Sequence, residues 1–240
     1  LPKGTFQQRV FTHTQWWKKT QPIFFYFGNE DDVELYVNHT GIMWEAARPF
    51  GAALVFAEHR YYGQSLPFAP GAKDCMQFLT TEQAMADFAE VIYALRDEWD
   101  AWDSKVIGFG GSYGGMLAAW FRLKYPNAVD GVLAASAPIW SCVRLDPPYS
   151  YGAFMARVTR DATSAGGARD GCAANVKRVF QQLASAATTA DGRATVAKGF
   201  NLCAVPRDAA DVDLVRQWFE APWGSLAMGD FPYASTYLMH

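Results

Sequence analysis

A glycine-rich segment around Ser112 contains residues whose types and spacing could support chemistry. Ser112 stands in a Gly-x-Ser-x-Gly pattern, with Gly110 and Gly114 two positions to either side. An apolar run over residues 105–110 predicts a strand before the serine, and residues 112–125 predict a helix after it. At such a turn the serine hydroxyl is exposed at the end of a sheet, and small neighbours let the backbone come close. The segment therefore predicts Ser112 as a nucleophile for acyl transfer.

The same turn has two other interpretations. A glycine-rich strand-to-helix turn can bind a phosphate, but no Lys-Ser or Lys-Thr pair ends this one, and Gly-x-Gly-x-x-Gly spacing is absent. These absences argue against nucleotide binding. The glycines could also form a turn that has no chemical role.

Acyl transfer needs hydrogen-bond donors for the negatively charged oxygen of the tetrahedral intermediate. The backbone N–H of Tyr113, at the start of the predicted helix, is one expected donor. A second is expected from Gly28 or Asn29, because they follow an aromatic strand predicted over residues 22–27. The adjacent Glu30 could bind a substrate ammonium group or anchor this loop by hydrogen bonds.

A nucleophilic serine also needs a histidine base and an acid. In hydrolases with the serine at such a strand-to-helix turn, both residues follow the serine in the sequence. Here His13, His39 and His59 all precede Ser112, and His240 is the last residue. For His59, at the end of a predicted strand, a structural hydrogen-bonded role is favoured. We expect the chain to be truncated at its C-terminus, with the acid and base beyond it.

The wider pattern predicts an α/β protein with a mostly parallel sheet, because apolar strand-like runs alternate with helical patterns. Residues 1–138 are interpreted as the N-terminal part of the α/β core, and residues 139–240 as a helical insertion that is incomplete. Thr80 and Asp208 are expected to cap helices, and Gly192 is expected in a turn between helices. Further strands are predicted over residues 53–57 and 131–135, and a helix over residues 41–50.

Composition excludes several classes of function. The net charge is −3 and no basic run is present, which argues against a nucleic-acid partner. No apolar stretch is long enough to span a membrane. The four cysteines have no metal-ligand spacing, so we expect neither a metal site nor a cofactor. Asn38-His39-Thr40 is an N-glycosylation acceptor, which favours glycosylation of Asn38 and an oxidising compartment.

Beyond these features, the sequence resembles the serine carboxypeptidase S28 family, which comprises Pro-X carboxypeptidases and dipeptidyl peptidase II. The resemblance implies an α/β-hydrolase core with a helical cap of the SKS type, Ser112 as nucleophile, and Asp and His partners in a C-terminal portion. It also implies that Met116 lines a pocket for proline, although ordinary helix packing is an equal alternative. Asp31 stands where the family usually has glycine. The matching segments include residues 23–30, 54–68, 79–84 and 110–138.

The function implied is that of a lysosomal or secreted serine exopeptidase, which cleaves peptides next to proline through an acyl-enzyme and without a cofactor. A Pro-X carboxypeptidase-like activity is expected first. The alternatives are a dipeptidyl peptidase II-like aminopeptidase, a lipase or esterase on the same core, and a catalytically inactive fragment or pseudo-enzyme. The expected partners are proline-containing peptides, and a homodimer is left open.

Overall fold

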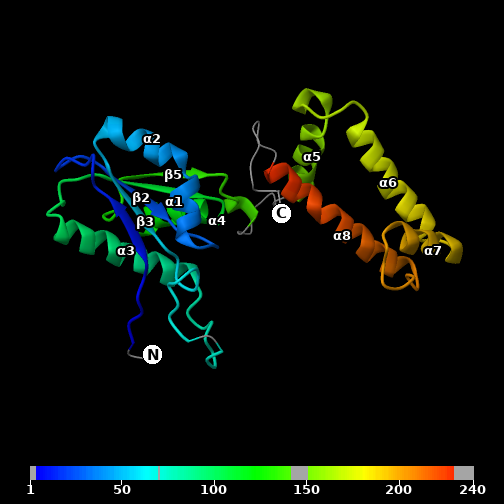
Figure 1. Cartoon of the computed structure of the whole chain (residues 1–240), viewed down its shortest axis with the longest axis horizontal. Helices are drawn as coiled ribbons and strands as arrows, with labels where there is room; N and C mark the ends of the chain where they lie inside the picture. The colour runs from blue at the N-terminus through cyan, green and yellow to red at the C-terminus, as the bar shows by residue number, and fades with distance from the viewer. Residues whose placement is uncertain (1–3, 70, 142–150, 230–240) are drawn as a thin grey trace. The chain divides into compact units, whose positions relative to one another are not determined.

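The computed structural model describes residues 4–69, 71–141 and 151–229. The chain divides into two compact units, Leu1–Leu145 and Asp146–His240. The described residues of the first unit form a sheet with helices, and those of the second are helical and contain no strand. The elements of both units are labelled in Figure 1.

Five strands form one sheet in the first unit, in the order β1-β3-β2-β4-β5. The pairing of β1 with β3 is antiparallel, and the other three pairings are parallel. Every residue of β2 and β3 is buried, as expected for central parallel strands covered on both faces. The four predicted strands are confirmed to within one residue, whereas β1 was not predicted. The strands are β1 (Val10–His13), β2 (Ile23–Phe27), β3 (Ala53–Ala57), β4 (Val106–Gly111) and β5 (Gly131–Ala135).

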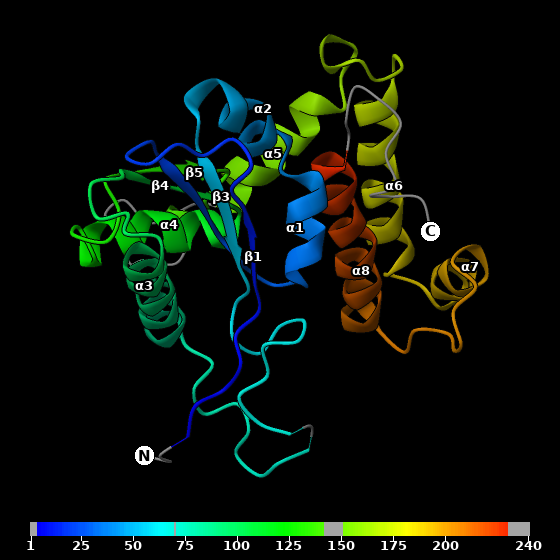
Figure 2. The same ribbon diagram turned by 60° about the vertical axis from the view of Figure 1, so that its left-hand side comes forward.

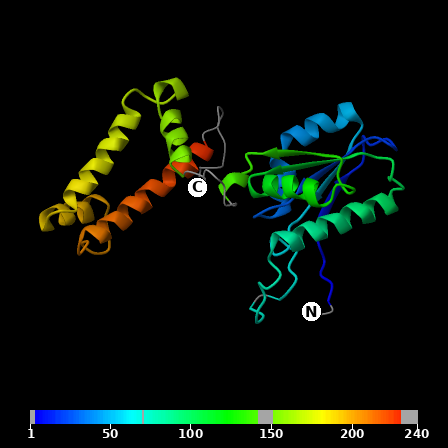
Figure 3. The same cartoon turned by 180° about the vertical axis from the view of Figure 1, so that it is seen from behind.

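Helices cover both faces of this sheet. Side chains of α1 and α2 join one hydrophobic cluster with the sheet, and side chains of α3 and α4 join another on the opposite face. Figure 3 shows α2 and α3 on opposite sides of the strands. The expected α/β core with a mostly parallel sheet is therefore confirmed. The helices are α1 (Val33–His39), α2 (Gly41–Phe50), α3 (Thr81–Glu98) and α4 (Tyr113–Lys124), followed by the short 3-10 helix η1 (Ile139–Ser141).

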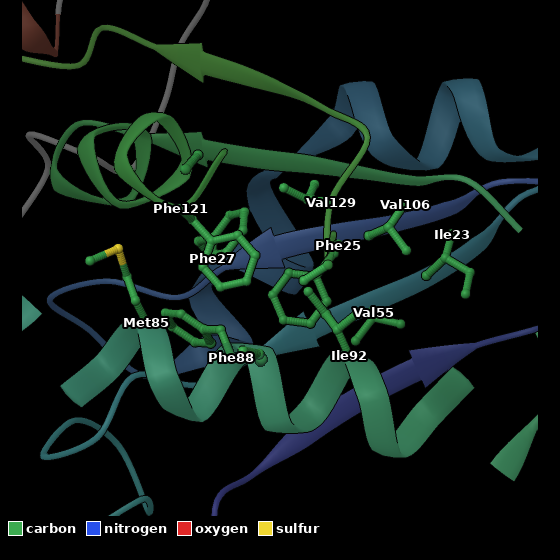
Figure 4. Close-up of a cluster of buried hydrophobic side chains, with 14 of the residues drawn as sticks. Ile23, Phe25, Phe27, Val55, Met85, Phe88, Ile92, Val106, Phe121 and Val129 are labelled. Carbon is green, nitrogen blue, oxygen red and sulfur yellow. The ribbon is translucent and has the colours of Figure 1, made fainter. Parts of the chain in front are cut away.

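The larger cluster fixes α3 and α4 against the strand that precedes the predicted oxyanion loop. The ring centroid of Phe27 on β2 lies 5.4 Å from that of Phe88 on α3 and 4.9 Å from that of Phe121 on α4. Figure 4 shows these three rings with Phe25 in one cluster between the helices and the sheet. Offset and edge-to-face aromatic pairs stabilise a core beyond the area that they bury. The carboxyl end of β2 is thereby held rigidly beneath α4.

Side-chain caps define where two of the predicted helices begin. The Thr80 hydroxyl accepts a hydrogen bond from Gln83 N, and the Asp208 carboxylate accepts one from Asp211 N. Both side chains satisfy amide groups that have no partner within the helix. The predicted caps at these two residues are therefore confirmed.

The second unit contains four α-helices and a short 3-10 helix among its described residues. Helix α8 contacts α5 and α6, and α6 also contacts α7. Figure 2 shows α6 and α8 running side by side. A small aromatic core joins them, because the ring of Phe219 packs against those of Phe180, Phe200 and Trp223. The elements are α5 (Tyr151–Asp161), η2 (Ser164–Gly166), α6 (Cys172–Ala186), α7 (Ala190–Gly199) and α8 (Ala209–Met228).

Candidate active site

Ser112 occupies a tight turn between β4 and α4. Its backbone has φ 54° and ψ −123°, a positive φ that few residues other than glycine adopt. Two backbone hydrogen bonds hold the turn, from Ser112 N to Ala135 O at 3.0 Å and from Met116 N to Ser112 O at 3.0 Å. Ser112 itself is exposed. A strained backbone that presents an exposed hydroxyl at the carboxyl end of a strand is the geometry of a nucleophile elbow.

Two glycines let the backbone fold this tightly. A Cβ atom at Gly110 would lie 2.1 Å from the carbonyl oxygen of Gly114, which is backbone and cannot rotate away. A Cβ atom at Gly114 would lie 2.8 Å from the carbonyl oxygen of Phe27 at the end of β2. The Gly-x-Ser-x-Gly spacing is therefore required by contacts in the folded chain, as the sequence predicted.

The expected oxyanion donors differ in whether their N–H groups are free. The amide of Tyr113 is the first of α4, so no carbonyl within the helix can accept from it. The amide of Gly28 donates to Ala57 O at 3.0 Å, so Gly28 offers no free N–H in this structure, contrary to its expected role. It instead permits close packing, because a Cβ atom there would lie 2.3 Å from Ala57 O. Within the described residues, the amides of Tyr113 and Asn29 remain as candidate donors.

Glu30 lies at the surface beside several tyrosines. Its Oε2 atom accepts a hydrogen bond from Asn29 Nδ2 at 2.6 Å, which is the loop-anchoring contact expected as one of its two roles. Burial raises the pKa of Tyr26 to about 12, and the nearby negative charge of Glu30 adds to this shift. Burial likewise raises the pKa values of Tyr62 and Tyr113, again with a contribution from Glu30. These phenols therefore stay neutral and can donate hydrogen bonds beside an acidic group.

Met116 lies on α4, one helical turn after Ser112. Only 5% of its surface is exposed, yet it belongs to neither of the two hydrophobic clusters of the sheet. Its expected role in lining a proline pocket therefore stays a prediction, as does the alternative of ordinary packing.

None of the described histidines is hydrogen-bonded to Ser112. His13 packs its ring against Trp16 and Trp44, and His39 Nδ1 lies 2.7 Å from Leu35 O. His240 lies outside the described residues. The described part of the chain thus presents a serine of nucleophile geometry without its general base.

His59 has a structural environment, as its sequence context indicated. It is 1% exposed, with Nδ1 2.6 Å from Arg60 O and Nε2 3.1 Å from Tyr113 Oη. Because a carbonyl can only accept, Nδ1 carries the proton and Nε2 accepts from the tyrosine hydroxyl. Burial lowers the pKa of His59, although the hydrogen bond to Arg60 partly opposes that shift. The neutral ring thereby holds the side chain of Tyr113, the residue next to Ser112.

We expect His59 to make the protein less stable as the pH falls below about 6.5, the pKa of an unfolded histidine. The unfolded chain then binds a proton that the folded chain excludes, so the free energy of unfolding falls by up to about 1.4 kcal/mol per pH unit, until the folded-state pKa is reached. In His59→Gln this contribution is absent. Urea unfolding of both proteins at pH 7.5 and 5.0 measures it, and equal losses of stability in the two proteins would contradict the prediction.

Other predicted features can be located in the structure. Asn38 is exposed near the end of α1. Cys75, Cys172 and Cys203 are free thiols, and Cys142 lies outside the described residues. No group of three or more potential metal ligands occurs within the described part of the chain. In that same part, no helix has both the length and the apolarity that a membrane span requires.

Comparisons with known proteins place these features in a family. A family model described as "Serine carboxypeptidase S28" matches residues 2–234. Lysosomal Pro-X carboxypeptidase from Homo sapiens is 45% identical over 239 residues, covering 98% of this chain and 47% of that protein. Prolyl carboxy peptidase like protein 5 from Caenorhabditis elegans is 35% identical over 240 residues, covering 97% and 46%. The chain therefore spans about half the length of these curated relatives.

A solved structure of proline iminopeptidase from Mycobacterium smegmatis also matches. It is 18% identical, with a TM-score of 0.45, and the match covers 93% of this chain and 67% of that one.

Proposed function

Because this chain belongs to the serine carboxypeptidase S28 family, we propose that the complete protein is a serine exopeptidase that cleaves peptides next to proline. The observation that carries this proposal is the exposed Ser112 hydroxyl at a strained turn between β4 and α4. A lipase or esterase on the same core is a weaker candidate, because the relatives that match nearly the whole chain have the names of carboxypeptidases.

In the proposed mechanism, Ser112 attacks the peptide carbonyl and loses its proton to a histidine outside the described residues. The C–N bond then breaks as that histidine protonates the leaving amine, which yields an acyl-enzyme that water hydrolyses. The N–H groups of Tyr113 and Asn29 stabilise the negatively charged oxygen of each tetrahedral intermediate. The N-terminus of α4 adds a favourable potential for that charge. Met116 contributes to the pocket for the proline ring, and the second unit forms the cap.

We further propose that the protein works in the secretory pathway, in lysosomes or after secretion. An exposed Asn38 within Asn38-His39-Thr40 supports this, since glycosylation acceptors are modified at the surface of secreted proteins. The name of the human relative contains the word lysosomal. The proposed partners of this protein are proline-containing peptides. A homodimer is an additional proposal.

The direction of cleavage has a second candidate. Glu30 places a carboxylate beside the site, and a carboxylate can bind the free α-amino group of a substrate, as an aminopeptidase requires. Dipeptidyl peptidase II-like cleavage is therefore the alternative to carboxypeptidase cleavage.

Two peptides and one probe test the proposed function. The complete gene product is incubated at acidic pH with an N-terminally blocked peptide ending in Pro-Phe, and with a free-amino X-Pro amide that carries a fluorescent leaving group. We expect release of phenylalanine from the blocked peptide, and a fluorophosphonate adduct on Ser112 by mass spectrometry. Cleavage of the X-Pro amide alone would favour the aminopeptidase. A folded protein that cleaves neither peptide and takes up no probe would refute the proposal.

A further inference from the structure

A fully buried carboxylate lies at the carboxyl end of β3, where the proposed mechanism assigns it no role. Glu58 is 0% exposed. Its Oε1 atom accepts hydrogen bonds from Arg9 Nη2 at 2.7 Å and Val33 N at 3.1 Å. Its Oε2 atom accepts from Gln64 N at 2.9 Å and Ser65 Oγ at 2.7 Å. Burial opposes ionisation, but these hydrogen bonds outweigh it and hold the pKa of Glu58 below its usual value.

Glu58 fixes one end of the candidate oxyanion loop, residues 28–32. The loop begins at Gly28, whose amide donates to Ala57 O at 3.0 Å, and it is followed by Val33, whose amide donates to the Glu58 carboxylate at 3.1 Å. Both ends of the loop are thus tied to consecutive residues at the end of β3. A five-residue loop held at both ends has few conformations left.

Arg9 adds a second tie between the same carboxylate and the loop. Its Nη2 atom donates both to Glu58 and to the carboxylate of Asp32. Asp32 also caps α1 by accepting from Glu34 N at 2.8 Å. Charge-assisted bonds of this kind are stronger than neutral ones. The N-terminus of α1 and the end of the loop therefore move with Glu58.

The loop in turn contacts the nucleophile turn. Asn29 is 5% exposed, and a Cβ atom at Gly114 would lie 3.2 Å from its Cγ atom. The Nδ2 atom of Asn29 donates to Glu30 Oε2 at 2.6 Å and lies 3.5 Å from Gly111 O. A displaced loop would therefore shift Asn29 relative to Ser112.

We infer that Glu58 is a positioning residue for hydrolysis, which holds residues 28–32 so that the N–H of Asn29 meets the oxyanion. This inference rests on the proposed function, in which that N–H is the second donor. Glu58 does not touch the substrate. Glu58 acts through the loop. Its loss should therefore weaken the stabilisation of the transition state and not the binding of the substrate.

The test is Glu58→Gln in the complete gene product, assayed with the blocked Pro-Phe peptide. The amide group places an NH₂ where one carboxylate oxygen now accepts hydrogen bonds, and it removes the charge that Arg9 contacts. We expect kcat to fall about 10-fold or more while KM changes less than about 3-fold. The inhibition constant of a peptidyl-prolyl aldehyde, which forms an oxyanion on the serine, should rise by the same factor as kcat/KM falls.

Asp87→Asn is the matched control, because it weakens another ion pair of the same unit away from the loop. Asp87 accepts from Arg60 Nε and Nη2, both at 2.6 Å, and Arg60 is 7% exposed. We expect this variant to lower Tm while leaving kcat within about 2-fold of the wild-type value. If Glu58→Gln and Asp87→Asn lower Tm equally, Glu58→Gln should still have the lower kcat.

Asp32→Asn covers the case in which Glu58→Gln does not fold. The Asp32 side chain is 40% exposed, and asparagine keeps an oxygen that can cap the helix. The variant should therefore fold. We expect kcat to fall about 3-fold with KM unchanged, because the tie through Arg9 weakens. Unchanged kcat in both variants, or an equal fall in Asp87→Asn, would overturn the inference alone. A wild-type protein that neither cleaves the peptide nor reacts with a fluorophosphonate would instead refute the proposed function and this inference together.

Discussion

Ser112→Gly is expected to abolish hydrolysis and at the same time to raise the free energy of unfolding. Loss of the nucleophile should lower kcat/KM by at least about 10⁴-fold. Glycine also removes the Cβ atom from a residue with φ 54°. The free energy gained by relieving that strain should exceed the free-energy cost of the extra entropy that glycine gives the unfolded chain. The free energy of unfolding should therefore rise by about 1 kcal/mol.

The matched variant is Ser112→Ala, which removes the hydroxyl but keeps the Cβ atom. It should lose as much activity as the glycine variant, with a stability within about 0.5 kcal/mol of the wild-type value. Urea unfolding and the blocked-peptide assay measure the two quantities separately. If the alanine and glycine variants are equally stable, the strain relieved at Ser112 does not exceed the entropic cost of glycine, and the prediction is contradicted.

Gly110→Ala is expected to cost about 3 kcal/mol of stability or more, enough to unfold a marginal protein. The added Cβ atom would lie 2.1 Å from Gly114 O and 2.4 Å from Gly114 C. Both atoms are backbone at the start of α4, so the clash can be relieved only by moving the helix or the strand. The Ser112 hydroxyl would move with them, and activity should fall as well.

The neighbouring Gly111 supplies the control for that change. A Cβ atom at Gly111 meets no heavy atom within 4 Å, so Gly111→Ala should change stability by no more than about 0.5 kcal/mol. The two variants add the same atom to adjacent residues of one strand. Soluble yield and the urea midpoint compare them, and equal stabilities would contradict the close approach of β4 and α4.

Strands β2 and β3 were predictable because they are continuous apolar runs buried on both faces. Strand β1 was missed for the opposite reason: Val10–His13 has four residues, and none of them is buried. Helix α1 was missed because its seven residues mix charged, apolar and polar side chains, among them the sequon at Asn38. Short, half-exposed elements depend on tertiary contacts that periodicity does not report.

Gly192 shows a different limit of sequence reasoning. It was expected in a turn, but it lies inside α7, where its amide donates to the Thr189 hydroxyl at 3.0 Å. A Cβ atom there would lie 2.3 Å from Ala186 O, so the helix needs glycine for close approach and not for a break. The residue type alone does not distinguish these two uses.

One part of the candidate site could be predicted from the sequence, and another part could not. The Ser112 turn was predictable because its close backbone contacts demand glycines at fixed spacing. The network around Glu58 was not, because its main partner, Arg9, is 49 residues away and nothing in the sequence pairs them. One signal was present: an acidic residue directly after a buried strand, followed by Gly63. A Cβ atom at Gly63 would lie 1.9 Å from the Glu58 carboxylate.

Strand β5 has a practical consequence for work with residues 1–240 alone. It is the last strand in the sheet order, and Leu133, Ala134 and Ala135 are exposed on it. An exposed, uncharged edge strand is a template on which another chain can add a strand. Such a preparation should therefore self-associate with rising concentration, and a lysine in place of Leu133 is a means of keeping it monomeric for crystallisation or spectroscopy.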